Sequence, residues 1–267
     1  MKKAGNIYIA VIFAVMYMPL IVMVIFSFNA ANSTSNFSGF STYWYSEMLR
    51  DAATMQALKN TFVLAGATAV CSTVLGTVAA VGIFGMKNKW FKSGILSVTN
   101  IPMMNPEIVT GVSLMLLFAF VGRITSSPEA LGFGTMLIAH VTFSLPYVVL
   151  NVLPKLRQTD PHLAEAAQDL GSTPVQAFFR VVLPSIMPGI VSGALMAFTL
   201  SIDDFVISHY VSGSYVTLPL LIYSMTKKRV TPKMYAVCTC IFLSVLALLL
   251  IMNIMQIRQA KKNKKSV

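Results

Sequence analysis

Long apolar runs alternate with short polar segments along this chain. Six runs are long enough to cross a bilayer, since about 20 helical residues at a rise of 1.5 Å cover a hydrocarbon core of about 30 Å. They lie at residues 7–28, 60–84, 94–121, 131–152, 187–210 and 235–257. The pattern predicts an all-α integral membrane protein with six transmembrane helices, organised as a single domain over residues 1–267.

The composition agrees with the pattern. Hydrophobic residues make up 56% of the chain and charged residues 11%, against about 25% charged residues in ordinary soluble domains. The first run is too long for the apolar part of a signal peptide, so we expect it to remain as the first span. The sequence lacks the phosphate-binding loop G-x-x-x-x-G-K-[ST], and no nucleophile with a base is evident, so we expect no enzymatic activity and no cofactor in this chain.

The basic residues indicate an orientation. The net charge is +11, and with both termini in the cytoplasm most Lys and Arg residues lie on the inner side, as the positive-inside rule requires. A basic cluster at Lys227, Lys228, Arg229 and Lys233 falls outside and has no evident role. Residues 215–225 are apolar but too short to cross, so they predict a short surface or re-entrant helix.

The most informative polar segment is the loop at 153–186, which contains DPHLAEAAQDLGSTPVQAFFRVVLP at 160–184. Asp160 is suited to cap a first helix and Gly171 to end it in the left-handed conformation. Thr173 is suited to cap a second helix, with Gln176 three residues later completing a capping box. The segment predicts a cytoplasmic helical hairpin that docks on a soluble protein. Its second helix has an apolar face, expected to point inward, formed by Val175, Phe178, Phe179 and Val182.

This hairpin resembles the EAA loop of the membrane subunits of ATP-binding-cassette (ABC) importers. The resemblance rests on Glu165, Ala166 and Ala167, followed by Gly171 and by the Leu-Pro pair at 183–184, all between the fourth and fifth predicted spans. It implies the type I importer permease fold, in which this loop is the coupling helix seated in a groove of the ATPase subunit. It also implies that Glu165 pairs with a basic residue of that ATPase.

Three acidic residues fall inside predicted spans, where a charge is costly and normally faces a cavity, a partner or a substrate. They are Glu107, Asp203 and Asp204. Glu107 follows Pro102 and Pro106, which should break the third helix. Two interpretations stay open. Either the acids contact a cationic cargo, or they are structural: Glu107 satisfies freed backbone groups or pairs with Arg123, and the aspartates cap a break near the end of the fifth helix. Because the spans hold no other evident basic residue to serve as a counter-ion for these acids, we expect cargo contact.

The segments FTLSIDDFVISHYVSG and TLPLLIYSM resemble the permeases of the spermidine and putrescine importers, in particular the second of their two permease subunits. The likeness extends to STYWY at 41–45, NPEIV at 105–109 and HVTFSLPYVV at 140–149. It implies a polyamine cargo, whose cationic nitrogens suit carboxylates near aromatic rings.

Trp44 lies in the outer segment after the first span, where it could line the mouth of the path through cation-π contact or simply belong to an interfacial aromatic belt. His140 and His209 are interpreted as satisfied structural residues. The resemblance further implies four kinds of partner: a sister permease, two cytoplasmic ATPase copies that hold ATP and Mg²⁺, an extracytoplasmic binding protein, and the lipid bilayer. The alternatives are the same machinery with a metal or organic ion as cargo, or a proton-coupled secondary transporter.

Overall fold

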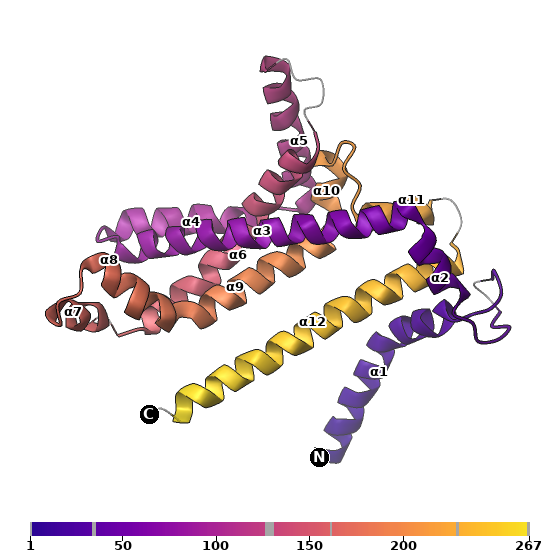
Figure 1. The fold of residues 1–267 in the computed structure, drawn as a ribbon, viewed down its shortest axis with the longest axis horizontal. Coiled ribbons are helices and arrows are strands. Elements are labelled where there is room, and N and C mark those ends of the chain that lie inside the picture. The colour runs from indigo at the N-terminus through magenta and orange to yellow at the C-terminus, as the bar shows by residue number, and fades with distance from the viewer. Residues whose placement is uncertain (1, 34–35, 126–130, 161, 228–229, 266–267) are drawn as a thin grey trace. The chain divides into compact units, whose positions relative to one another are not determined.

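The computed structural model describes residues 2–33, 36–125, 131–160, 162–227 and 230–265, and these are helical apart from short connections (Figure 1). The elements are α1 (Lys2–Ser27), α2 (Tyr43–Arg50), α3 (Ala52–Gly85), α4 (Lys89–Met104), α5 (Glu107–Ile124), α6 (Phe133–Gln158), α7 (His162–Asp169), α8 (Pro174–Ala177), the π-helix η1 (Phe178–Val182), α9 (Leu183–Asp203), α10 (Val206–Val211), α11 (Leu218–Thr226) and α12 (Pro232–Lys265). The all-α prediction is confirmed.

The chain forms two compact units, one of residues 1–57 with 221–267 and one of residues 58–220, while the single membrane domain stays a prediction.

Five helical stretches of the described chain are long and apolar enough to cross a membrane. They are Tyr8–Ser27, Ala52–Gly85, Glu107–Ile124, Phe133–Gln158 and Pro174–Asp203. The sixth expected span lies in α12, where the apolar stretch Pro232–Ala247 is shorter. The short helix expected near 215–225 is α11, which has nine residues.

The third predicted span, residues 94–121, is not one helix. It is divided between α4 and α5, and Figure 1 shows α5 leaving the direction of α4. Asn105 is extended, at φ −76° and ψ 141°, and Pro106 precedes the first turn of α5. Proline disfavours helical geometry in the residue before it and donates no hydrogen bond, so the chain changes direction here. The expected break is confirmed at Pro106, whereas Pro102, which was also expected to break the helix, lies inside α4.

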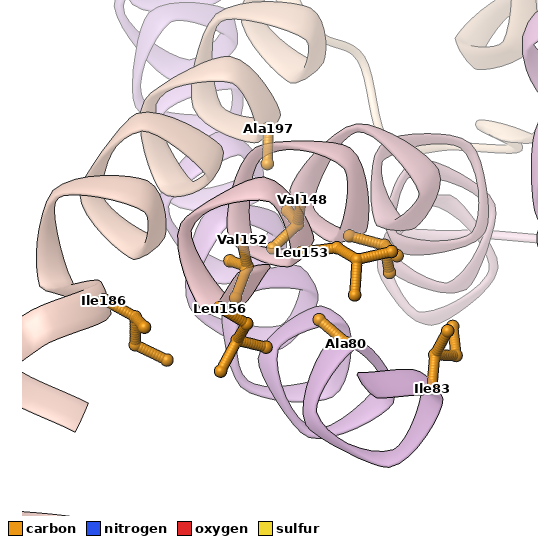
Figure 2. Close-up of a cluster of buried hydrophobic side chains, with 9 residues drawn as sticks. Ala80, Ile83, Val148, Val152, Leu153, Leu156, Ile186 and Ala197 are labelled. Atoms are coloured by element: carbon orange, nitrogen blue, oxygen red, sulfur yellow. The ribbon is translucent and has the colours of Figure 1, made fainter. Parts of the chain in front are cut away.

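The core of the second unit lies around α6 (Figure 2). One cluster of buried residues comes from α3, α6 and α9: Ala80, Ile83, Val148, Val149, Val152, Leu153, Leu156, Ile186 and Ala197. Helix association in lipid depends on close packing, for which small residues at the contact are suited. A Cβ on Gly193 would lie 3.2 Å from the Cα of Val148, and one on Gly189 would lie 2.8 Å from the carbonyl oxygen of Asn151. The glycines therefore set the approach of α9 to α6.

The π-helix η1 joins α8 to α9 without interrupting the helical chain from Pro174 to Asp203. It lies directly before Leu183 and Pro184. In a regular α-helix the ring of Pro184 would meet the carbonyl group of Arg180, four residues earlier. One wider turn removes that conflict, since π-turns shift the hydrogen-bonding register. The Leu-Pro pair thus marks the point where the hairpin passes into α9.

In the first unit, α12 packs against α1 and α2. The loop before α2 is organised by Asn29, whose side-chain amide donates to the carbonyl oxygens of Ser33 and Asn36, both at 2.8 Å. Its Oδ1 accepts from the backbone N–H of Ser38 at 2.9 Å. These bonds satisfy the fully buried polar side chain of Asn29 and close the loop before α2.

Candidate functional site

The turn of the predicted hairpin, residues 160–182, has the geometry that its sequence predicts. The Oδ1 of Asp160 accepts from the backbone N–H of His162 at 2.9 Å, which caps α7. Gly171 has φ +90°, and the N–H of Ser172 donates to the carbonyl oxygen of Ala167, which closes the helix in a Schellman-type turn. Thr173 and Gln176 form both bonds of the capping box, at 3.2 and 3.3 Å.

The apolar face of the second hairpin helix does not point inward as expected. The side chains of Val175 and Phe179 are 65% and 60% exposed, while Phe178 and Val182 are partly buried. Leu170, at the tip of the turn, is 89% exposed. The expectation for Val175 and Phe179 is wrong because an amphipathic pattern identifies an apolar face but not the surface that covers it. The hairpin therefore presents apolar side chains to its surroundings.

Glu165 lies on the exposed side of α7, next to His162. The Oε2 of Glu165 is 2.9 Å from the Nδ1 of His162, with both side chains largely exposed. Hydrogen bonding and then the charge of Glu165 raise the pKa of His162 above its ordinary 6.5. The site residues Ala166 and Ala167 follow on the same helix, Ala166 exposed and Ala167 half-buried. Glu165 thus keeps most of its surface available for a partner.

The end of α9 separates the two aspartates. Asp204 ends the helix, and its carboxylate is turned into the protein, with 4% of the side chain exposed. It accepts from the backbone N–H groups of Ile207 and Ser208 in α10, at 3.2 and 2.7 Å. Its Oδ2 lies 3.3 Å from the Nε2 of His140 in α6. The alternative in which an aspartate caps a break in the fifth span thus fits Asp204, and the expectation that it lacks a basic neighbour is wrong.

Asp203, by contrast, is exposed, as is Glu107 in the first turn of α5. Neither carboxylate has an ion-pair partner among the residues that the structure describes. Arg123 lies in the last turn of α5, about 24 Å from Glu107 along the helix at 1.5 Å per residue, so the two do not pair.

The neighbourhoods of these two acids meet in one corner of the second unit. Gly111, one turn after Glu107, packs against α10, where an added Cβ would lie 2.8 Å from the ring of Tyr210 and 3.4 Å from the Cα of Ile207. Ile207 follows Asp203 by four residues. The first turn of α5 and the break after α9 therefore form one packed region, and α10 lies beside the start of α5 in Figure 1.

Trp44 belongs to the first unit and is half-buried. Its indole N–H donates to the carbonyl oxygen of Asn29 at 2.9 Å, and its ring meets Tyr43 edge to face with centroids 5.1 Å apart. These contacts give Trp44 a local structural role. They leave part of the ring free for a further contact.

The basic cluster that the sequence predicts to lie outside has partners for some of its charges. The Nζ of Lys233 lies 2.9 Å from Oδ2 of Asp51, and the Nζ of Lys227 lies 4.5 Å from the centroid of the Tyr223 ring. Lys228 and Arg229 lie outside the described residues. Two of the four positive charges therefore have partners within the same unit.

Sequence comparison decides the family. The model of the family described as "Binding-protein-dependent transport system inner membrane component" matches residues 72–265, well over half of the chain. The chain belongs to this family. It is thus a membrane-spanning component of a transport system that depends on a binding protein, and not an enzyme, as expected.

Individual relatives are similar over most of their length. The chain is 40% identical to the putrescine transport system permease protein PotI of Escherichia coli K12 over 230 residues, 86% of this chain and 82% of the relative. It is 37% identical to the spermidine/putrescine transport system permease protein PotC of the same strain, covering 91% of this chain and 89% of PotC. The likeness to polyamine-importer permeases expected from the motifs is confirmed.

Solved structures share the fold at low sequence identity. A bacterial ABC transporter that imports the acidic polysaccharide alginate matches with a TM-score of 0.71 at 16% identity over 96% of both chains. The methionine ABC transporter MetNI matches with a TM-score of 0.59 at 17% identity, over 79% of this chain and 98% of that one. The fold is therefore that of ABC-transporter membrane subunits.

Proposed function

We propose that this chain is one of two permease subunits of an ATP-driven polyamine importer. It crosses the cytoplasmic membrane six times in the type I importer arrangement, with α12 as the sixth span and both termini in the cytoplasm. A sister permease supplies the other half of the pore, and an extracytoplasmic binding protein delivers putrescine or spermidine. The observation that carries the proposal is the pair of exposed carboxylates at one corner, in a chain whose relatives are named for these cargoes.

The hairpin of α7 and α8 docks on the ATPase subunit. Its exposed apolar side chains, Leu170, Val175 and Phe179, suit a hydrophobic groove, and Glu165 suits a basic residue at the rim. ATP and Mg²⁺ are bound by that ATPase, of which two copies serve the two permeases. Closure of the ATPase pair moves the hairpin and, through α9, opens the cavity toward the binding protein.

Glu107 and Asp203 bind the cationic nitrogens of the cargo during passage, since both carboxylates are exposed on this subunit and unpaired within its described part. Charge-assisted hydrogen bonds to carboxylates are about twice as strong as neutral ones. Trp44 contributes an aromatic face on the outer side. Asp204 belongs to the wall of the path, but its carboxylate faces inward and does not reach the cargo.

The proposal is tested by co-expressing this chain with its sister permease, ATPase and binding protein, and reconstituting the complex in proteoliposomes that contain Mg-ATP. Labelled putrescine and spermidine should enter at the expense of ATP and with dependence on the binding protein. Glu107→Gln and Asp203→Asn should each raise the half-saturating concentration about tenfold, the effect of losing one charge-assisted contact.

Glu47→Gln is the matched control, because it removes one carboxylate charge at a position to which we assign no role. It should leave uptake unchanged. Wild-type polyamine uptake in both Glu107→Gln and Asp203→Asn would show that the cargo is recognised elsewhere. Uptake driven by a proton gradient in the absence of ATP would instead favour the secondary transporter, and ATP-dependent uptake of a metal or organic ion alone would change the cargo.

A further inference from the structure

A buried histidine joins the two helices on either side of the break near Asp203. His140 lies in the N-terminal half of α6 and is 2% exposed. Its Nδ1 is 2.7 Å from the Oγ of Ser201 in the last turn of α9. Its Nε2 is 3.0 Å from the Oγ of Ser208 in α10, so that one imidazole ring bridges both helices.

Asp204 completes this network from the break itself. Its two carboxylate oxygens accept from the N–H groups of Ile207 and Ser208, and Oδ2 also lies next to Nε2 of His140. Ser201 and Ser208 are buried as well, at 4% and 0% exposed. All polar contacts of the group are therefore directed inward, to α6, α9 and α10.

Such a network is a poor way to gain stability alone. Burying a carboxylate and an imidazole removes their hydration, and well-packed apolar residues of the same volume often stabilise a protein as well or better. What the network supplies is a defined geometry, because each donor and acceptor fixes the position of another. Here it fixes the last turn of α9 relative to the first turn of α10.

The residue whose direction depends on that geometry is Asp203. It is the last residue of α9, directly before Asp204 and two residues after Ser201, and it is exposed. Neighbouring residues of an intact helix differ by about 100° around the axis. Ending the helix between the two aspartates sends one carboxylate inward, to His140, and leaves the other at the surface.

We propose that His140 and Asp204 form a positioning pair that aims the carboxylate of Asp203 into the cargo path, and that neither member of the pair touches the cargo. The inference rests on the proposed function for the identity of the cargo. Ser201 and Ser208 hold the imidazole ring in place. The two adjacent aspartates therefore have different roles, and Asp203 alone is the binding carboxylate of this segment.

The test is a set of single and double variants of the complete reconstituted importer, with half-saturating concentration and maximal rate measured separately. Asp203→Asn should raise the half-saturating concentration of polyamine about tenfold. His140→Ala should raise it by a similar factor, because Asp203 is no longer aimed. In the Asp203→Asn background His140→Ala should add less than twofold, since the residue it positions has already lost its charge.

Two further variants keep the proposal testable should His140→Ala fail to assemble. His140→Gln retains polar atoms near both serines, and Ser208→Ala removes a single hydroxyl group, so each should give a smaller shift in the same direction. Thr142→Ala is the matched control on the same helix, because its hydroxyl group donates only to the carbonyl oxygen of Ile138 within α6. Multiplicative effects of His140→Ala and Asp203→Asn, or a change in maximal rate alone, would overturn the positioning role.

A cargo-independent measurement separates this proposal from the proposed function. In a background with Cys71, Cys238 and Cys240 replaced by alanine, the Asp203→Cys variant reports its accessibility to a cationic methanethiosulfonate reagent. Addition of His140→Gln should change that rate at least threefold if the pair aims residue 203. An unchanged rate overturns the positioning pair, whatever the cargo proves to be. No effect of Asp203→Asn on uptake, combined with a changed rate, refutes polyamine binding by Asp203 and leaves the positioning pair standing.

Discussion

The Nζ of Lys233, at the start of α12, lies 2.9 Å from the Oδ2 of Asp51, which ends α2. Both side chains are about three-quarters buried, so the pair is screened less than a surface ion pair. The same carboxylate oxygen accepts from the hydroxyl group of Thr54. Within the first unit, this pair fixes the start of α12 beside the junction of α2 and α3.

The Asp51–Lys233 contact should contribute less stability at acidic pH than at neutral pH. The hydrogen bond from Thr54, and then Lys233, lower the pKa of Asp51 below its ordinary 3.8 in the folded protein. The contribution of Asp51 is therefore fully present above the pKa of the unfolded chain and is lost as pH falls through the lower folded-state pKa. Asp51→Asn should lower the thermal midpoint at pH 6 by the equivalent of about 1 kcal/mol, and should lose less on acidification to pH 3 than the wild type. Asp169→Asn, at an exposed carboxylate, is the control, and equal acid sensitivity of wild type and Asp51→Asn would contradict the assignment.

Gly189 should tolerate no side chain. A Cβ there would lie 2.8 Å from the carbonyl oxygen of Asn151 and 2.7 Å from the Cγ of Lys155, so α9 must move away from α6. We expect Gly189→Val to destabilise the chain by about 1–3 kcal/mol, as overpacked sites do. Thermal unfolding of the detergent-solubilised protein measures this. Gly82→Ala in α3 is the control, since an added Cβ meets nothing within 4 Å, and an unchanged midpoint for Gly189→Val would argue against this packing.

Substitutions of Gly171 should affect the hairpin through the backbone conformation at this position and not through steric contact. Its φ of +90° disfavours other residues, whereas the space around an added Cβ is open. Gly171→Val should therefore cost about 1–2 kcal/mol of hairpin stability and reduce uptake per ATP hydrolysed, while Gly171→Asn should be milder. Parallel measurement of ATP hydrolysis and uptake in proteoliposomes distinguishes uncoupling from loss of protein. Normal coupling in Gly171→Val, with the ATPase still bound, would remove the hairpin from the coupling role.

The Glu165→Ala variant is an independent test of whether the hairpin of α7 and α8 docks on the ATPase. Because Glu165 and His162 are largely exposed in this chain alone, removing the carboxylate should leave insertion and folding intact. It should weaken co-purification of the ATPase and lower cargo-stimulated hydrolysis severalfold. Full retention of both would indicate that the ATPase docks elsewhere.

The chain by itself should transport nothing. As proposed, it carries one coupling hairpin and one half of a pore. Purified and reconstituted alone, it should give no uptake of putrescine under ATP or a proton gradient. Energised accumulation by the single chain would refute the two-permease arrangement.

Features determined by neighbouring residues were the ones that the sequence could predict. The capping box of Thr173 and Gln176, the left-handed Gly171 and the break at Pro106 follow from local backbone chemistry, and the structure contains all three. Tertiary partners could not be predicted in this way. The sequence around Asp204 does not indicate that its spatial neighbour is His140, because the two residues come together only when α6, α9 and α10 pack. Nor can the apolar character of Phe179 distinguish a face packed on its own chain from one left for another protein.

The unbroken helical chain from Pro174 to Asp203 has a mechanical consequence. Thirty residues at 1.5 Å per residue span about 45 Å, with the hairpin at one end and the exposed carboxylate of Asp203 at the other. A rotation at the hairpin end can reach Asp203 through this helix, which contains the wider turn Phe178–Val182. A rotation of about 20° moves a side-chain oxygen about 6 Å from the axis by about 2 Å. That displacement is enough to make or break a hydrogen bond of about 2.8 Å, so under the proposed function a small twist at the hairpin would suffice to release a bound cation.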